Sequence, residues 1–153
     1  MAIAASTRPI RPDTRAVGPN LNLDDGARLL LRVSLGALML LHGIAKLTGG
    51  IAGIQGMVAK AGLPPALGYL VYLGEVVAPL LLIVGLWTRA AALVLAVNMV
   101  VAVALVHLGQ FGTIAPTGGW ALELQAFYFV MAVAVALLGA GRFSIGGAGG
   151  RWN

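Results

Sequence analysis

The sequence predicts an all-α integral membrane protein, a bundle of four transmembrane helices with both termini in the cytoplasm. Of its 153 residues, 59% are hydrophobic and only 10% are charged, whereas a soluble domain typically carries about 25% charged residues. Four apolar runs also approach the roughly 20 residues that a helix needs to cross a bilayer. The runs are continuously apolar and do not alternate, so strands of a membrane barrel are not expected.

The apolar runs define the expected helices. Asp24 and Asp25 precede the first run, where acidic residues stabilise a helix N-terminus. The second run starts just after Pro64–Pro65, and the short turn Thr88–Arg89 makes the second and third helices antiparallel. The expected spans cover residues 27–47, 66–87, 90–108 and 121–140.

Basic residues predict the orientation, because cytoplasmic segments of membrane proteins carry an excess of Lys and Arg. Only Lys46 and Lys60 fall on the predicted outer side, together with the loops 48–65 and 109–120. The same distribution argues against a nucleic-acid partner, since the basic residues flank apolar runs and do not form a basic, aromatic surface. The residues on the predicted cytoplasmic side are Arg8, Arg11, Arg15, Arg28, Arg32, Arg89, Arg142 and Arg151.

The segments outside the spans differ in character. Residues 1–26 are polar and are expected to form a disordered cytoplasmic arm, with no signal peptide. Residues 147–153 form a short glycine-rich tail. In the first loop, apolar residues such as Ile51, Ile54 and Val58 recur at helical spacing, which predicts an interfacial or re-entrant helix.

A small set of ionisable and polar residues interrupts the apolar runs, and such residues usually face the interior of a bundle and mark a ligand, proton or electron site. At about 1.5 Å of rise per residue, most of them fall in the outer half of the membrane. We therefore expect a polar funnel that narrows from the outer surface to Glu75 near the midplane. The expected members are His42, Lys46, Glu75, Asn98, His107 and Glu123.

Glu75 is the candidate proton-exchanging residue, because a buried carboxyl is neutral unless it is paired. The alternative is a structural role, in which Glu75 bridges to Asn98 or to a basic side chain. Lys46 matches Glu123 best in depth, which predicts a structural ion pair between those two. The basic residues considered as partners for Glu75 are Lys46, His42 and Arg32.

The remaining candidate residues are two histidines and two arginines. Three roles are considered for His42 and His107, namely ligating haem as neutral imidazoles, hydrogen bonding to a quinone, and a structural bond to backbone or to Glu123. Because the two histidines differ in depth, quinone is favoured over haem. Arg32 is expected to extend toward the cytoplasmic surface, as long basic side chains do near helix ends. Arg142 is expected to help set the orientation of the protein in the membrane, as a basic residue on the cytoplasmic side. The chain has no cysteine, which excludes disulfides and thiolate-ligated metal sites, and no other metal site is expected.

The order of several short motifs resembles the DoxX family of small bacterial membrane proteins. The resemblance covers about residues 27–146 and includes Thr88-Arg89, His107 and Glu123 in corresponding places. It is carried by the motifs Leu41-His42-Gly43, Lys46-Leu47, Gly62-Leu63-Pro64, Gly74-Glu75 and Gly139-Ala140-Gly141-Arg142-Phe143-Ser144-Ile145.

The resemblance implies a four-helix protein of the bacterial inner membrane that takes part in membrane oxidoreductase complexes, including thiosulfate:quinone oxidoreductase. Combined with the polar funnel, it leads to the expectation of an accessory or quinone-interacting subunit. Quinone is the expected cofactor, and other redox subunits or further copies of the chain are the expected partners. The alternatives are a non-catalytic scaffold of a membrane complex and a small-solute transporter.

Overall fold

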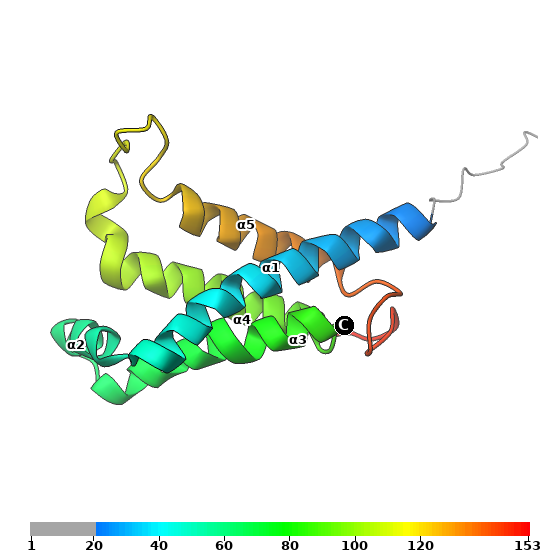
Figure 1. Cartoon of the computed structure of the whole chain (residues 1–153), viewed down its shortest axis with the longest axis horizontal. Helices are drawn as coiled ribbons and strands as arrows, with labels where there is room; N and C mark the ends of the chain where they lie inside the picture. Colours follow the sequence, from blue (N-terminus) through cyan, green and yellow to red (C-terminus); the bar gives the residue numbers. More distant parts are fainter. Residues whose placement is uncertain (1–20) are drawn as a thin grey trace, which may run out of the picture.

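The computed structural model describes residues 21–153, and these residues are helical except for turns, loops and one isolated β-bridge between Ile114 and Trp120. Long helical segments run along the bundle, and a short helix lies across one end of it (Figure 1). The α-helices are α1 (Leu21–Gly49), α2 (Ala52–Lys60), α3 (Ala78–Val84), α4 (Thr88–Ala102) and α5 (Glu123–Leu138). The shorter helical elements are η1 (Pro65–Leu70), η2 (Leu73–Val77), η3 (Val103–His107) and η4 (Leu108–Gln110).

Three segments of the described chain are long and apolar enough to cross a membrane, namely Leu23–Gly49, Pro65–Val84 and Thr88–Gln110. The protein is therefore a multi-pass membrane protein. The fourth expected span, 121–140, forms the shorter apolar helix α5 of 16 residues. At 1.5 Å per residue this helix is about 24 Å long, which is less than the roughly 30 Å of a bilayer core.

The first helix begins at Leu21, earlier than the expected residue 27. Residues 21–26 of the expected disordered arm are thus helical, and residues 1–20 lie outside the described part of the chain. Asp24 occupies the first turn. Asp25 is 8% exposed and accepts a hydrogen bond of 3.1 Å from the backbone N–H of Arg142. This contact joins the first turns of α1 to the segment that follows α5.

The second span is built from η1, η2 and α3 in succession and ends at Gly85. Gly85 has a φ of +72°, and the N–H groups of Gly85 and Leu86 donate to the carbonyls of Leu82 and Leu81, which forms a Schellman cap. Trp87, with a φ of +48°, completes the turn. The turn expected at Thr88–Arg89 is therefore displaced toward the N-terminus, and those two residues begin α4.

The core lies among α1, α3, α4 and α5, with α4 and α5 packed along much of their length. Leu35, Leu82, Leu95 and Ala132 each have no exposed surface, and Met39 is 1% exposed. Around this core, many large apolar side chains remain exposed, as the lipid-facing surface of a membrane protein requires. The start of α1 and Asn153 lie at the same end of the bundle (Figure 1), and the side of the membrane that this end faces stays a prediction.

Arg32 does not extend to the surface as expected, because its side chain is 1% exposed and bonded to the protein. Its guanidinium donates to the carbonyls of Leu82 and Ile83 at 2.7 Å each and to the carbonyl of Phe143. Within residues 21–153 its Nε has no acceptor. Arg32 thus joins the end of α3 to the segment that follows α5, where carbonyls at a helix C-terminus attract a cation.

The segment after α5 folds back under the bundle. The N–H groups of Ala140 and Arg89 donate to the backbone carbonyls of Asn153 and Trp152 at 2.7 and 3.0 Å. Asn153 is 8% exposed, and its Oδ1 accepts from the hydroxyl of Thr88 at 3.2 Å. The expected glycine-rich tail, 147–153, is therefore an ordered part of the fold. We call the segment 139–153, together with Arg28, Arg32 and Arg89, the arginine end.

Replacing Arg32 with Met should destabilise the protein by about 3 kcal/mol, because it removes charge-assisted hydrogen bonds and leaves the carbonyls of Ile83 and Phe143 without their guanidinium donor. Arg151→Met is the matched control, since Arg151 is exposed and its guanidinium lies over the ring of Trp152, with 5.6 Å between Cζ and the ring centroid. Thermal unfolding in detergent measures both variants. Equal midpoints for the two variants would contradict the bridging role of Arg32.

Candidate functional site

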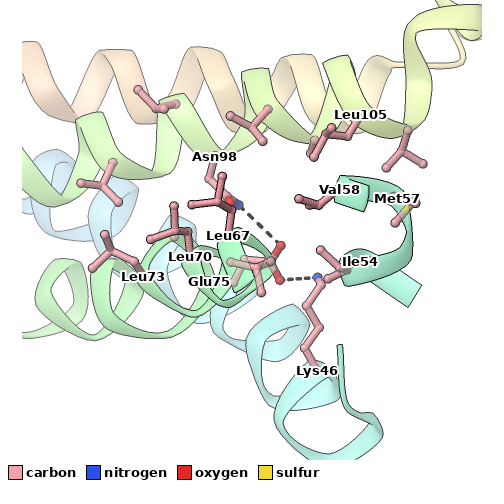
Figure 2. A pocket seen from close by; sticks show the side chains of 18 of the residues that line it. Lys46, Ile54, Met57, Val58, Leu67, Leu70, Leu73, Glu75, Asn98 and Leu105 are labelled. Carbon is pink, nitrogen blue, oxygen red and sulfur yellow. Dashed lines mark hydrogen bonds and ion pairs between the residues drawn. The ribbon is translucent and has the colours of Figure 1, made fainter. Parts of the chain in front are cut away.

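A cavity of about 710 Å³ lies between α2, the second span and the α4–η3 segment. Its volume falls within the range of small-molecule sites. Figure 2 shows aliphatic side chains from several elements around it, with Glu75 at its wall. In the described chain, no Phe, Tyr or Trp lines it, and its polar members are Lys46, Glu75, Asn98 and His107.

Glu75 is the centre of the polar wall, and its side chain is 8% exposed. One carboxylate oxygen, Oε2, accepts from the ammonium of Lys46, which reaches it from the last turn of α1. The other oxygen, Oε1, lies 3.5 Å from Nδ2 of Asn98 on α4. Both contacts are drawn in Figure 2. The carboxylate is therefore bound from two neighbouring helices at once.

The predicted pair of Lys46 with Glu123 is wrong, because Lys46 pairs with Glu75. Depth along the helix suggested Glu123, but a lysine side chain spans several ångströms and can turn toward the midplane. The hydroxyl of Tyr72 donates to the backbone carbonyl of Lys46 at 3.3 Å, which holds the second span against the end of α1. Glu123 is exposed at the start of α5, beside Gly119, and does not line the cavity.

Two glycines allow the helices to approach the carboxylate so closely. A Cβ at Gly43 would lie 2.1 Å from the backbone oxygen of Glu75, so α1 packs directly on η2. A Cβ at Gly74 would lie 2.5 Å from Cγ of Asn98, so the amide fits against the second span. Small residues at helix contacts are the usual means of close packing in membranes.

Two π-helical turns border the same cavity, one in each of the spans that form its walls. Glu75 lies in η2, and His107 ends η3. Isolated π-turns inside helices are frequent at functional sites. A π-turn changes the direction of the side chains that follow it, and the repeating apolar pattern of the sequence does not reveal one. This feature was not predicted.

The two histidines are separated by the fold. His107 lines the cavity, and its Nδ1 lies 3.0 Å from Oε1 of Gln110. His42 is exposed on another face of α1, where its Nδ1 lies 3.1 Å from the carbonyl of Leu38. Its ring packs edge-on against Tyr128 of α5, with centroids 5.8 Å apart. The structure thus brings Lys46, Glu75, Asn98 and His107 to one cavity and leaves His42 and Glu123 outside it.

The arrangement suits a neutral ligand with a polar head and an apolar body. The charges of Lys46 and Glu75 cancel, so the polar wall offers hydrogen bonds without a net charge. The remaining N–H groups of the ammonium and the amide of Asn98 can donate to a carbonyl oxygen. Within residues 21–153, no three His, Cys, Asp or Glu residues are placed to hold a metal ion.

Replacing Gly43 with Ala should destabilise the protein by about 2 kcal/mol, because the added methyl group meets backbone and forces α1 away from Glu75. Gly26→Ala is the control on the same helix, since nothing lies within 4 Å of its Cβ. That control should be neutral or stabilising by up to about 1 kcal/mol. Thermal unfolding in detergent compares the two, and a neutral Gly43→Ala would exclude the close contact.

Comparison with known proteins gives one match. A model of the DoxX family matches residues 27–108, which is more than half of the chain and includes every residue that lines the cavity. No curated protein and no solved structure matches the sequence. On the strength of the family match, the chain belongs to the DoxX family of membrane proteins.

Proposed function

We propose that this protein is a quinone-interacting subunit of a membrane oxidoreductase and that the cavity beside Glu75 receives the quinone head group. The observation that carries the proposal is a buried carboxylate in the wall of a large aliphatic cavity. This carboxylate, on Glu75 of the second span, forms an ion pair with Lys46 of α1. Burying an ionisable group in a membrane span is energetically unfavourable, so such groups are rare and usually belong to a ligand or proton site.

The donor set fits a quinone. A quinone carbonyl needs donors, and Lys46 and Asn98 supply them at the polar wall. An isoprenoid tail needs aliphatic surface, which side chains such as Leu70, Leu73 and Leu105 provide (Figure 2). When bound, the quinone would supply the redox chemistry, and Glu75 would accept or return a proton at its carboxylate.

The wider setting follows from the same proposal. The sequence contains no cysteine and no evident redox centre of its own, so a partner subunit would deliver or remove electrons. The bacterial inner membrane is the proposed location. The arginine end is proposed to face the cytoplasm because its arginines outnumber the two lysines, Lys46 and Lys60, at the opposite end.

A scaffold role is the second candidate, and one observation favours it. Both oxygens of Glu75 already have partners inside the protein, which is also what a purely structural bridge between helices requires. The two functions differ in a measurable way, because a scaffold needs no saturable ligand site beside Glu75.

Glu75→Gln should weaken binding of a decyl-tailed benzoquinone roughly tenfold, since it removes the charge that orients Lys46. Val94→Trp, which fills the cavity wall, should abolish binding. Glu123→Gln and Val130→Trp are the controls, as both side chains are exposed and outside the cavity. Equilibrium dialysis of the full chain in phosphatidylcholine nanodiscs measures the dissociation constants.

Three results are informative. Roughly tenfold weaker binding in Glu75→Gln and no binding in Val94→Trp, with both controls unchanged, support the quinone site. No saturable binding to the unmodified protein, together with a lower unfolding temperature for Glu75→Gln, supports the scaffold. Equal affinity in Val94→Trp and Val130→Trp would place any quinone outside the cavity.

A further inference from the structure

We propose that Lys46 relays protons between Glu75 and water at the α2 end of the bundle, and that the arginine end is closed to protons. The α2 end is the end that carries α2 and the loop 111–122 (Figure 1). The inference rests on the proposed function only for the source of the proton. It gives the site a direction, because a proton taken up by Glu75 would leave on one side of the membrane.

The path from Glu75 to water passes through Lys46. The side chain of Lys46 is 27% exposed while that of Glu75 is 8% exposed, so Lys46 is the more accessible member of the ion pair. Lys46 belongs to the last turn of α1, close to the end of the span. Two further titratable groups lie beside this pair, namely Tyr72, whose hydroxyl donates to the Lys46 carbonyl, and His107, which lines the same cavity. The elements that contact η2 also carry His42 on α1 and Tyr69 on η1.

The opposite direction is blocked by an apolar layer. Asn98 is the polar contact that Glu75 makes on α4, and beyond it the helices meet through side chains with almost no exposed surface. Leu35, Leu82 and Leu95 are fully buried. These three leucines have no side-chain group that could pass a proton along, and they fill the space in which water would have to stand. Among the described residues of this core cluster, Tyr128 is the one with a titratable group.

A buried positive charge reinforces this block. Arg32 precedes Gly43, the residue that contacts Glu75, by three helical turns, or about 16 Å along α1. It is 1% exposed, and in the described chain its bonds go to carbonyls and not to a carboxylate. A fixed cation inside a membrane protein is an electrostatic barrier to protons.

The relay balances in protons. A proton accepted by the Glu75 carboxylate gives the neutral acid, and the Lys46 ammonium then loses one proton to water at the α2 end. The neutral amine of Lys46 takes the proton from the Glu75 acid, which restores the ion pair. The net result is one proton moved from the cavity to water, with no oxidant or reductant consumed. Proton uptake is the same sequence in reverse.

Because the chain has no cysteine, single cysteines can test which side reaches Lys46. A membrane-impermeant, cationic methanethiosulfonate reagent is applied to the full chain in right-side-out spheroplasts and in inverted vesicles. Lys60→Cys and Arg151→Cys, both exposed and at opposite ends, report the two sides. Lys46→Cys should react only from the Lys60 side, and Leu82→Cys from neither side. Labelling of Lys46→Cys from the Arg151 side, or from neither side, would overturn the proposal.

Substitutions at Lys46 distinguish proton transfer by the ammonium from a role in which it only positions Glu75. Lys46→Arg keeps a cation beside Glu75 but cannot release a proton, and Lys46→Met removes the cation. The infrared carboxyl band that Glu75→Gln abolishes reports protonation of Glu75 after a pH jump. Both Lys46 variants should slow its appearance roughly a hundredfold. A normal rate in Lys46→Arg would show that the cation only positions Glu75. Neither experiment contains quinone, so each can fail while quinone binding stands, and the reverse.

Discussion

The burial of one carboxylate constrains much of this structure. A charged Glu75 inside a membrane span is tolerated only if it is paired and hydrogen-bonded, because desolvating an unpaired charge is highly unfavourable. The fold meets this requirement from two directions, with Lys46 on α1 and Asn98 on α4. Gly43 and Gly74 permit both approaches. The contact between α1 and the second span, the position of α4 and one wall of the cavity all depend on this arrangement.

The two ends of the bundle are organised by different means. At the arginine end, a buried guanidinium and the returning segment 139–153 close the helices with hydrogen bonds to backbone carbonyls. At the α2 end, α2 packs on η1, where Gly68 lets it come close, and its residues Ile54, Met57 and Val58 cover the cavity (Figure 2). One end is therefore tightly bonded, whereas the other surrounds a cavity of ligand size.

Much of the fold could be predicted from the sequence because lipid imposes simple rules. Three of the expected spans are long apolar helical segments in the structure. The helix expected in the first loop is also present, as α2. Two departures involve features that the apolar runs do not encode. Asp25, which lies in α1 before the expected start of the span, bonds to Arg142, more than a hundred residues away in sequence. The position of the turn before α4 depends on the left-handed conformations of Gly85 and Trp87.

The residues that line the cavity were easier to predict from the sequence than the contacts between them. Intramembrane polarity selected six residues. Glu75, Lys46, Asn98 and His107 line the cavity, whereas His42 and Glu123 do not. Depth along a helix does not give the direction in which a side chain points, so it assigned Lys46 to the wrong acid and grouped exposed His42 with the site. Arg32 was expected at the surface because the carbonyls that bind it are brought together only by the tertiary fold.

Photo-crosslinking can determine whether quinone binds in the cavity beside Glu75. The full chain in nanodiscs is irradiated with an azido-quinone, and the modified peptides are identified by mass spectrometry with and without excess unlabelled quinone. If quinone binds in the cavity, adducts form on residues 63–75 and 93–107 and disappear with the competitor. Adducts spread equally over α5 and unaffected by the competitor would contradict it, because they would report only quinone dissolved in the lipid.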